Sequence, residues 1–165
     1  MLLQEKGYIR GPFGSALVRS ELKKEGIPVY EQDNAINDNR LFRYFIDDNK
    51  YQELKRFTVQ KNDLIISCSG NVGRITLIKE NDPKGIISQA LLLLRPNIEI
   101  VNPKYLLYYF RSPIGFFQLT QASHGSVQVN IAPRATVENI DAYLPEKAEQ
   151  NEIVEILSSL DEKLS

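Results

Sequence analysis

The sequence contains very little of what catalytic and metal-binding sites are usually made of. Among its 165 residues there is one cysteine, Cys68, and one histidine, His124. A single cysteine excludes a disulfide framework and a cysteine-based zinc site, and it fits a reducing, cytoplasmic setting. No cluster of His, Cys and Asp has the spacing of metal ligands, and neither GxxxxGK[ST] nor GxGxxG occurs. We therefore predict no catalytic residue, no metal site and no cofactor.

Long apolar runs are also missing. No stretch approaches the roughly 18 residues of a membrane helix, and the N-terminus lacks a signal-peptide pattern. The longest apolar cluster, at 90–94, has the length of a strand. A chain of 165 residues is one domain, with at most an appendage.

The charges are distributed unevenly. The net charge is −1, which by itself argues weakly against nucleic-acid binding. Residues 1–137 nevertheless hold 18 Lys and Arg against 13 Asp and Glu, whereas residues 138–165 hold 2 against 8. Because a basic body can carry a phosphate-binding face that the overall charge conceals, this distribution raises the possibility of nucleic-acid binding.

The hydrophobic pattern predicts a mixed α/β domain followed by one long helix. The clearest β signal is a hairpin, in which residues 63–68 and 74–78 are joined by a glycine-containing turn at 69–73. Further strands are predicted at 27–30, 41–46 and 85–96, and helices at 15–26, 49–57, 103–112, 112–123 and 135–140. The polar, Asn-rich segment 31–40 is predicted to be an exposed loop.

The C-terminal residues 146–164 carry the pattern of a long amphipathic helix. Glu146 and Glu149 oppose the positive end of the helix in its first turn. An apolar seam with spacings of four, three and four is formed by Ile153, Leu157, Leu160 and Leu164. Since no upstream helix of comparable length is available, the seam predicts a partner in another chain or in a longer parent protein; packing against its own domain is the alternative.

Polar loop residues indicate a surface that could read duplex DNA. Asn, Gln and Arg side chains can read base edges, and Ser, Lys and Arg can hold phosphates. The candidates are Asn34, Asn37, Arg40, Arg43, Asn71, Arg74, Ser123, His124, Ser126 and Gln128. We predict that Arg43, Arg74 and the 123–128 loop share one face. Taken singly, each candidate could instead be a solvated turn residue.

The order of these segments resembles the target recognition domain of the DNA-specificity subunit of type I restriction-modification systems. The matching pieces are, in order, GPFGS, GIPVY, KNDLIISCSGNVGR, ISQALLLLRP, PKYLLYYFRS, HGSVQVNI and LPEKAEQNEIVEIL. The hairpin block and the Pro-x-x-x-x-Gln-x-x-Ile-Val exit are the most specific of them. Together they cover nearly the whole chain.

The resemblance implies a compact mixed-sheet recognition domain over 1–144 and the start of a conserved spacer and dimerisation helix over 145–165. It implies binding to one half of a bipartite site in double-stranded DNA. It also implies docking to modification subunits and a restriction subunit, which carry out methyl transfer and cleavage with S-adenosylmethionine and ATP. The specificity component itself is implied to be non-catalytic.

Members of this family carry two recognition domains joined by long antiparallel helices, whereas this chain has one. The resemblance therefore implies either a fragment of a two-domain subunit or a half-subunit that pairs with itself through the helix. Two other classes remain as alternatives. One is an enzyme, although no second histidine or facing carboxylate pair is evident; the other is a protein-interaction module that does not bind DNA.

Overall fold

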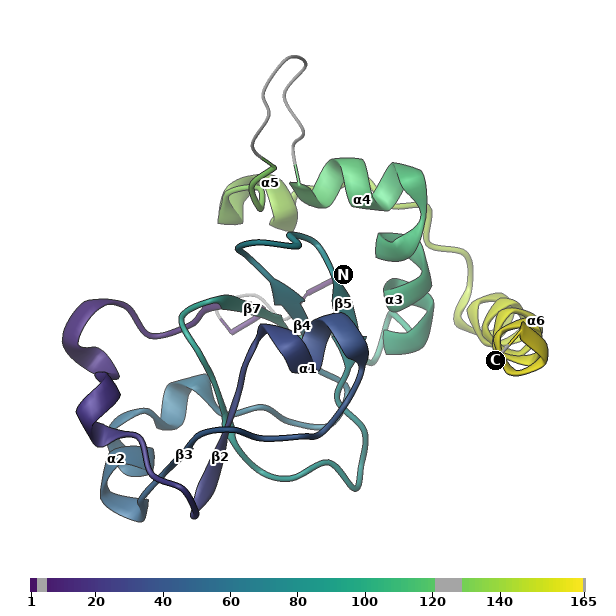
Figure 1. Ribbon diagram of the computed structural model, residues 1–165. Coiled ribbons are helices and arrows are strands. Elements are labelled where there is room, and N and C mark those ends of the chain that lie inside the picture. The colour runs from purple at the N-terminus through teal and green to yellow at the C-terminus, as the bar shows by residue number, and fades with distance from the viewer. Residues whose placement is uncertain (3–5, 121–128, 165) are drawn as a thin grey trace.

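The computed structural model describes residues 1–2, 6–120 and 129–164, in which two small sheets are surrounded by short helices (Figure 1). One sheet is antiparallel with the order β1-β7-β4-β5, and the other has the order β3-β2-β6 with β2 parallel to β6. The strands are β1 (Tyr8–Arg10), β2 (Ile27–Tyr30), β3 (Phe45–Ile46), β4 (Leu64–Ser67), β5 (Ile75–Leu77), β6 (Ile86–Ile87) and β7 (Leu91–Leu94). The predicted mixed α/β class is confirmed.

Short helices cover both sheets, and one long helix follows at the end. The helices are α1 (Gln32–Asn37), α2 (Asp48–Glu53), α3 (Pro103–Arg111), α4 (Pro113–Thr120), α5 (Arg134–Glu138) and α6 (Lys147–Leu164). Three single-turn 3₁₀-helices are η1 (Gly14–Ala16), η2 (Arg19–Glu21) and η3 (Lys55–Phe57). Helix α3 starts where the sequence predicts, with Pro103 in its first turn and the Asn102 side chain accepting a hydrogen bond from the Lys104 backbone N–H.

The predicted hairpin is confirmed as the β4–β5 pair. Ile65 lies opposite Thr76 in an antiparallel register. In the connecting turn, Gly70 and Gly73 have φ angles of 61° and 82°, a region that favours glycine.

The four leucines of β7 place this strand at the centre of the molecule, because none of them is exposed. Successive side chains of a strand point to opposite faces of its sheet. Leu91 and Leu93 accordingly pack into a core with β2, β6 and α2, whereas Leu92 and Leu94 pack into a second core with α3, α4 and α5. The four-stranded sheet is therefore buried on both faces, which explains a leucine run without polar alternation.

Three predicted elements are corrected by the structure. The single helix predicted at 15–26 is replaced by η1 and η2, because Val18 between them is extended. The strand predicted at 41–46 is reduced to β3. The segment 85–96 does not continue one sheet: β6 joins the three-stranded sheet and β7 the four-stranded sheet.

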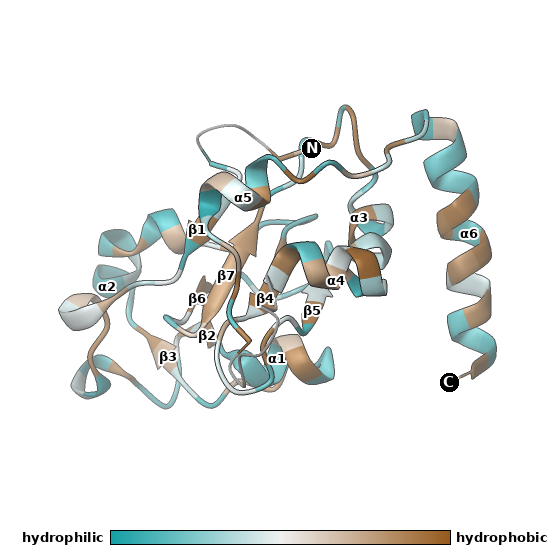
Figure 2. Ribbon diagram, turned by 90° about the horizontal axis from the view of Figure 1, so that it is seen from above, coloured by the Kyte–Doolittle hydropathy of each residue, from teal (hydrophilic) through white to brown (hydrophobic). Residues whose placement is uncertain are grey.

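Helix α6 lies at the opposite end of the molecule from α2 (Figures 1 and 2). Its first turns are fixed by Gln150, whose side chain is completely buried. The Gln150 amide accepts a hydrogen bond from the Asn102 backbone N–H (2.7 Å) and donates to the carbonyls of Ile100 (3.1 Å) and Pro145 (2.9 Å). This one side chain therefore joins α6 to the segment that begins α3.

The predicted apolar seam of α6 is covered only in its first half. Ile153 packs against the core beneath α3, and Leu157 is half-buried. The Tyr108 hydroxyl of α3 donates a hydrogen bond to the Asp161 carboxylate (2.8 Å). Leu164 beyond this contact is 87% exposed. What covers the second half of the seam remains a prediction. None of the described helices is long and apolar enough to span a membrane.

We predict that Gln150→Ala lowers the free energy of unfolding by about 1–3 kcal/mol, because it removes a buried amide and leaves the part-buried Asn102 N–H and Ile100 carbonyl without their partner. Urea denaturation followed by circular dichroism measures this change. Glu152→Ala, two residues away on the exposed side of α6, is the matched control and should change stability by less than about 0.5 kcal/mol. Equal effects of the two variants would contradict the role of Gln150.

Candidate functional site

The segment predicted as an exposed loop contains helix α1, which is built around a buried asparagine. Asn34 is 1% exposed. Its side-chain oxygen accepts a hydrogen bond from the Glu31 backbone N–H (2.8 Å), and its amide donates to the Asn39 side chain and the Leu41 carbonyl, both at 3.0 Å. The helix is therefore stabilised by local polar contacts that an apolar pattern does not reveal.

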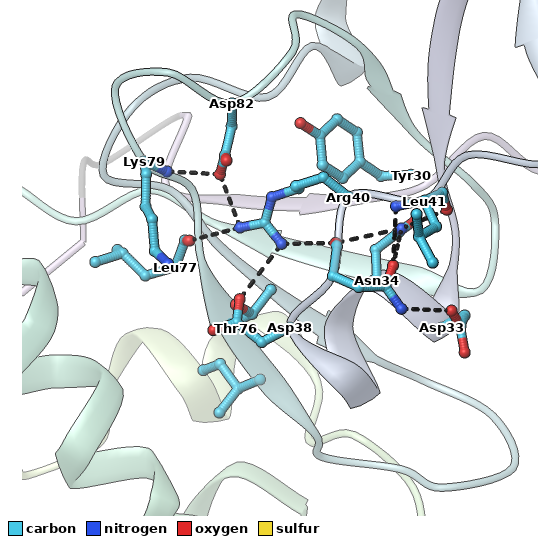
Figure 3. Close-up of polar contacts among 12 residues, drawn as sticks. Tyr30, Asp33, Asn34, Asp38, Arg40, Leu41, Thr76, Leu77, Lys79 and Asp82 are labelled. Carbon is cyan, nitrogen blue, oxygen red and sulfur yellow. Dashed lines mark hydrogen bonds and ion pairs between the residues drawn. The ribbon is translucent and has the colours of Figure 1, made fainter. Parts of the chain in front are cut away.

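Arg40 completes this arrangement by fastening the end of α1 to the hairpin (Figure 3). Its guanidinium forms an ion pair with Asp82 (2.7 Å) and donates to the Leu77 carbonyl (3.1 Å). Asp38, in the left-handed region with a φ of 47°, accepts a hydrogen bond from the Thr76 hydroxyl. The Asn34 amide and the terminal guanidinium nitrogens of Arg40 thus have partners inside the protein. A DNA-contacting role for these two residues remains a prediction.

Arg40 stays charged and Tyr30 stays neutral around neutral pH. Burial alone would lower the pKa of the Arg40 guanidinium, but the hydrogen bond and charge of Asp82 outweigh burial and raise that pKa. Burial, together with the Asp82 carboxylate, raises the pKa of Tyr30 to about 12. The neutral Tyr30 hydroxyl donates to the Pro83 carbonyl (2.6 Å). The protonation states of Arg40 and Tyr30 are therefore not expected to change in the physiological pH range.

A recess of about 620 Å³, which we call the α1 recess, lies beside the start of α1. Its walls come from 31–34, from 41–43, and from Ser88 and Ala90. Gln32, in the first turn of α1, donates a hydrogen bond to the Ser69 hydroxyl in the β4–β5 turn. This contact brings the hairpin turn to the edge of the recess, although the two segments are far apart in sequence.

Arg43 is the cation among the described residues that line the α1 recess, and 70% of its side chain is exposed. It pairs with Glu31 (2.9 Å), and the hydrogen bond from this pair raises the pKa of the guanidinium. The guanidinium also lies 4.6 Å from the centre of the Tyr44 ring. Because an exposed ion pair contributes only about 0–1 kcal/mol, Arg43 can exchange Glu31 for a ligand.

Three other predicted candidates, Asn37, Asn71 and Arg74, are exposed. Asn37 is exposed at the end of α1 and donates to Asp33 (2.6 Å). Asn71 and Arg74 are exposed at the hairpin turn, and within the described residues the Arg74 guanidinium has no ion-pair or hydrogen-bond partner. Ser123, His124, Ser126 and Gln128 lie outside the described residues.

The hairpin turn contacts α4 on its other side. A Cβ atom on Gly73 would lie 2.5 Å from the Phe116 ring, so the turn packs closely on this helix. Helix α4 ends at Thr120, directly before residues 121–128. The shared face of Arg43, Arg74 and the 123–128 loop remains a prediction.

Sequence reasoning missed Gln32 and Asp33, although both line the α1 recess. The signal in the sequence was local. Asn34 follows Glu31 by three residues, a spacing that lets the Asn34 side chain accept a hydrogen bond from the Glu31 backbone N–H at the start of a helix. Recognising the helix would have placed the side chains of its first turn beside the recess.

Neither a cluster of metal ligands nor a reactive thiol is found among the described residues. Within residues 1–2, 6–120 and 129–164, no group of three or more His, Cys, Asp or Glu could hold a metal ion. Burial raises the pKa of the Cys68 thiol to about 11, so the thiol is protonated at neutral pH and is a poor nucleophile.

The family model described as type I restriction modification DNA specificity domain matches residues 13–165, and the chain therefore belongs to this family. It is 30% identical over 108 residues to the Type I restriction enzyme EcoBI specificity subunit of Escherichia coli, covering 66% of this chain and 22% of that protein. It is 26% identical over 124 residues to the Putative type I restriction enzyme MjaX specificity subunit of Methanocaldococcus jannaschii, covering 71% and 28%.

Solved structures show the same fold. The chain superposes on one from a type I R-M system with a TM-score of 0.69 and 19% identity, covering 94% of this chain and 36% of that chain. The HsdS subunit from Thermoanaerobacter tengcongensis gives a TM-score of 0.66 and 19% identity, covering 94% and 35%. This chain spans about a quarter of the length of the curated relatives and about a third of the solved ones.

We predict that Asn34→Ala lowers the free energy of unfolding by about 1–3 kcal/mol, because it leaves the Glu31 N–H and Leu41 carbonyl unpaired. The same substitution at Asn37, on the exposed side of α1, is the control and should cost less than about 0.5 kcal/mol. Thermal and urea denaturation of both variants measure the difference. A tolerated Asn34→Ala would show that α1 does not depend on this side chain.

Proposed function

We propose that this chain recognises double-stranded DNA in a sequence-specific manner and reads one half of a bipartite target. The observation that carries the proposal is the family match over 13–165, which spans the α1 recess, the hairpin and α6. In this proposal residues 1–144 form the recognition domain and residues 145–165 begin the spacer helix.

The chemistry around the α1 recess supports base reading. A glutamine can form two hydrogen bonds with adenine, an arginine with guanine, and a carboxylate can accept from cytosine. Gln32, Asp33 and Arg43 supply these three groups at the recess, and Asn71 and Arg74 add an amide and a second guanidinium at the adjoining turn. A helix braced by buried polar contacts can hold such side chains in a defined geometry.

We further propose that modification and restriction subunits supply the chemistry. The relatives are specificity subunits of type I restriction enzymes, so methyl transfer with S-adenosylmethionine and ATP-dependent cleavage are assigned to partner subunits. The chain itself then acts as a non-catalytic component. A cytoplasmic location accords with this role on DNA.

The exposed side of α6 supports a partner helix. Ile156, Leu160 and Leu164 are exposed on it, and Figure 2 shows apolar segments along this helix. Each such side chain contributes roughly 1.5–3 kcal/mol when it is fully buried. We propose that a second copy of this chain, or the remaining part of a longer subunit, packs antiparallel on this side.

DNA recognition is tested by selection from a randomised duplex library with the purified chain. We expect enrichment of a short contiguous motif. Arg43→Ala should relax the motif at one or two positions and weaken binding to the selected duplex by about 10- to 100-fold, because a bidentate base contact contributes about 1–3 kcal/mol of discrimination. Competition binding with single-base variants of the duplex measures this.

Arg19→Ala is the control for this experiment, since Arg19 is an exposed arginine of η2 outside the α1 recess. It should leave the motif unchanged. Failure of the wild-type chain to bind any duplex at low salt, with self-association intact, would favour a protein-interaction module instead.

Helix pairing is tested by sedimentation velocity over a range of concentrations. Leu160→Asp should shift a self-associating chain towards the monomer, because a carboxylate would enter the apolar contact. Ser159→Asp introduces the same charge at the neighbouring exposed position and should leave association nearly unchanged. A wild type that stays monomeric at every concentration would exclude self-pairing of this chain.

A further inference from the structure

A second recess, which we call the basic groove, lies along the edge strand β1. It has a volume of about 830 Å³, and its walls come from β1, η3 and α5. The Tyr8 hydroxyl of β1 donates to the Ala132 carbonyl just before α5 (3.2 Å), and Figure 2 shows β1 and α5 side by side. Its cationic lining residues are Lys6, Arg10, Lys55, Arg56, Arg95 and Arg134, and no Asp or Glu is among the described residues that line it.

Two of these cations already have carboxylate partners. Arg95 forms two hydrogen bonds with the buried Asp63, both at 2.8 Å, and Arg134 pairs with Glu138 at 2.7 Å. The remaining cations differ from Arg40 and Arg43, which are neutralised by neighbouring carboxylates. No ion pair with a described carboxylate is formed by Lys6, Arg10, Lys55 or Arg56.

The two unpaired arginines are oriented by aromatic rings. The Arg10 guanidinium lies 5.9 Å from the centre of the Phe13 ring, and that of Arg56 lies 4.7 Å from the centre of the Phe57 ring. A guanidinium held against a ring keeps its N–H groups available for oxygen acceptors. Phe13 is itself 61% exposed, so it offers an apolar surface to a sugar beside the charges.

The basic groove and the α1 recess share a contact between their walls. Gly11 lines the basic groove, and Ser88 lines the α1 recess. A Cβ atom on Gly11 would lie 1.9 Å from the Ser88 carbonyl oxygen, so the two segments touch backbone to backbone. The two recesses therefore border on the same pair of contacting backbone segments.

From the unpaired cations and this shared contact we infer that the basic groove binds the phosphate backbone of one DNA strand, next to the bases that the α1 recess reads. The inference rests on the proposed function and adds the path of the backbone. Phosphate contacts fix register and orientation, whereas contacts to base edges supply sequence discrimination. Substitutions in the groove should therefore change affinity and its salt dependence without changing the preferred sequence.

The experiment compares two doubly substituted chains that lose the same charge. Lys55→Gln with Arg56→Gln removes two exposed cations of the groove, and Lys24→Gln with Lys79→Gln removes two exposed lysines that do not line it. Binding of each chain to the selected duplex and to a scrambled duplex is measured between about 50 and 200 mM salt. Circular dichroism melts establish that both variants fold.

Each lost phosphate contact reduces the slope of log K against log salt by about 0.9. We expect the slope of the groove variant to fall by about two, with its ratio of selected to scrambled affinity unchanged, and the control slope to stay near the wild-type value. Equal slopes for the groove variant and the control would overturn the groove assignment while leaving DNA recognition intact. A wild-type chain that binds no duplex would contradict both the groove assignment and the proposed DNA recognition.

A second arm separates DNA phosphates from small phosphate ligands. Inorganic phosphate and ATP are titrated against the wild type at constant ionic strength. Saturable ATP binding that disappears in the groove variant, with an unchanged DNA salt slope, would assign the groove to a nucleotide and overturn the proposal. We expect inorganic phosphate and ATP to bind the wild type only weakly and without saturation.

Discussion

The position of α1 depends on one buried polar network, and the α1 recess is built beside the helix that this network holds. A helix of six residues has almost no stability of its own, because one and a half turns do not offset the cost of helix nucleation. Asn34 binds the helix to its flanking chain, and Arg40 ties that chain to Asp82 and to the backbone of β5. The Gln32–Ser69 contact at the recess then follows from where α1 is held.

Apolar periodicity made the framework predictable. Strand β7, the β4–β5 hairpin, α3 and α6 all carry patterns that burial imposes directly on the sequence. Helix α1 was missed because its stability comes from amide hydrogen bonds, which leave a polar sequence resembling a loop. The exposure of site residues could not be predicted from residue type either. Arg40 and Arg43 are both arginines and lie three positions apart, yet their side chains are 18% and 70% exposed. The basic groove was not predicted because Lys6, Arg10 and Lys55 come from distant segments.

The two recesses differ in the charged residues that line them. Glu31 and Asp33 stand at the α1 recess, whereas the basic groove carries cations without lining carboxylates. A polyanion approaching this surface is repelled at the first and attracted at the second. Such a pattern orients a charged ligand before contact, in addition to holding it afterwards. A chain with a net charge of −1 thus carries a groove lined by cations without carboxylates among its described lining residues.

The anchoring of α6 through Gln150 makes this helix a lever. Its 18 residues extend for about 27 Å, and contacts with α3 and the segment before it hold the helix from Gln150 to Asp161. A tilt of the whole helix by about 10° about its first turn would move the far end by about 5 Å, which exceeds the roughly 3.4 Å rise between neighbouring bases on a DNA strand. Anything attached to the far end is consequently placed with an accuracy that depends on the stiffness of the contacts between α6 and the rest of the domain.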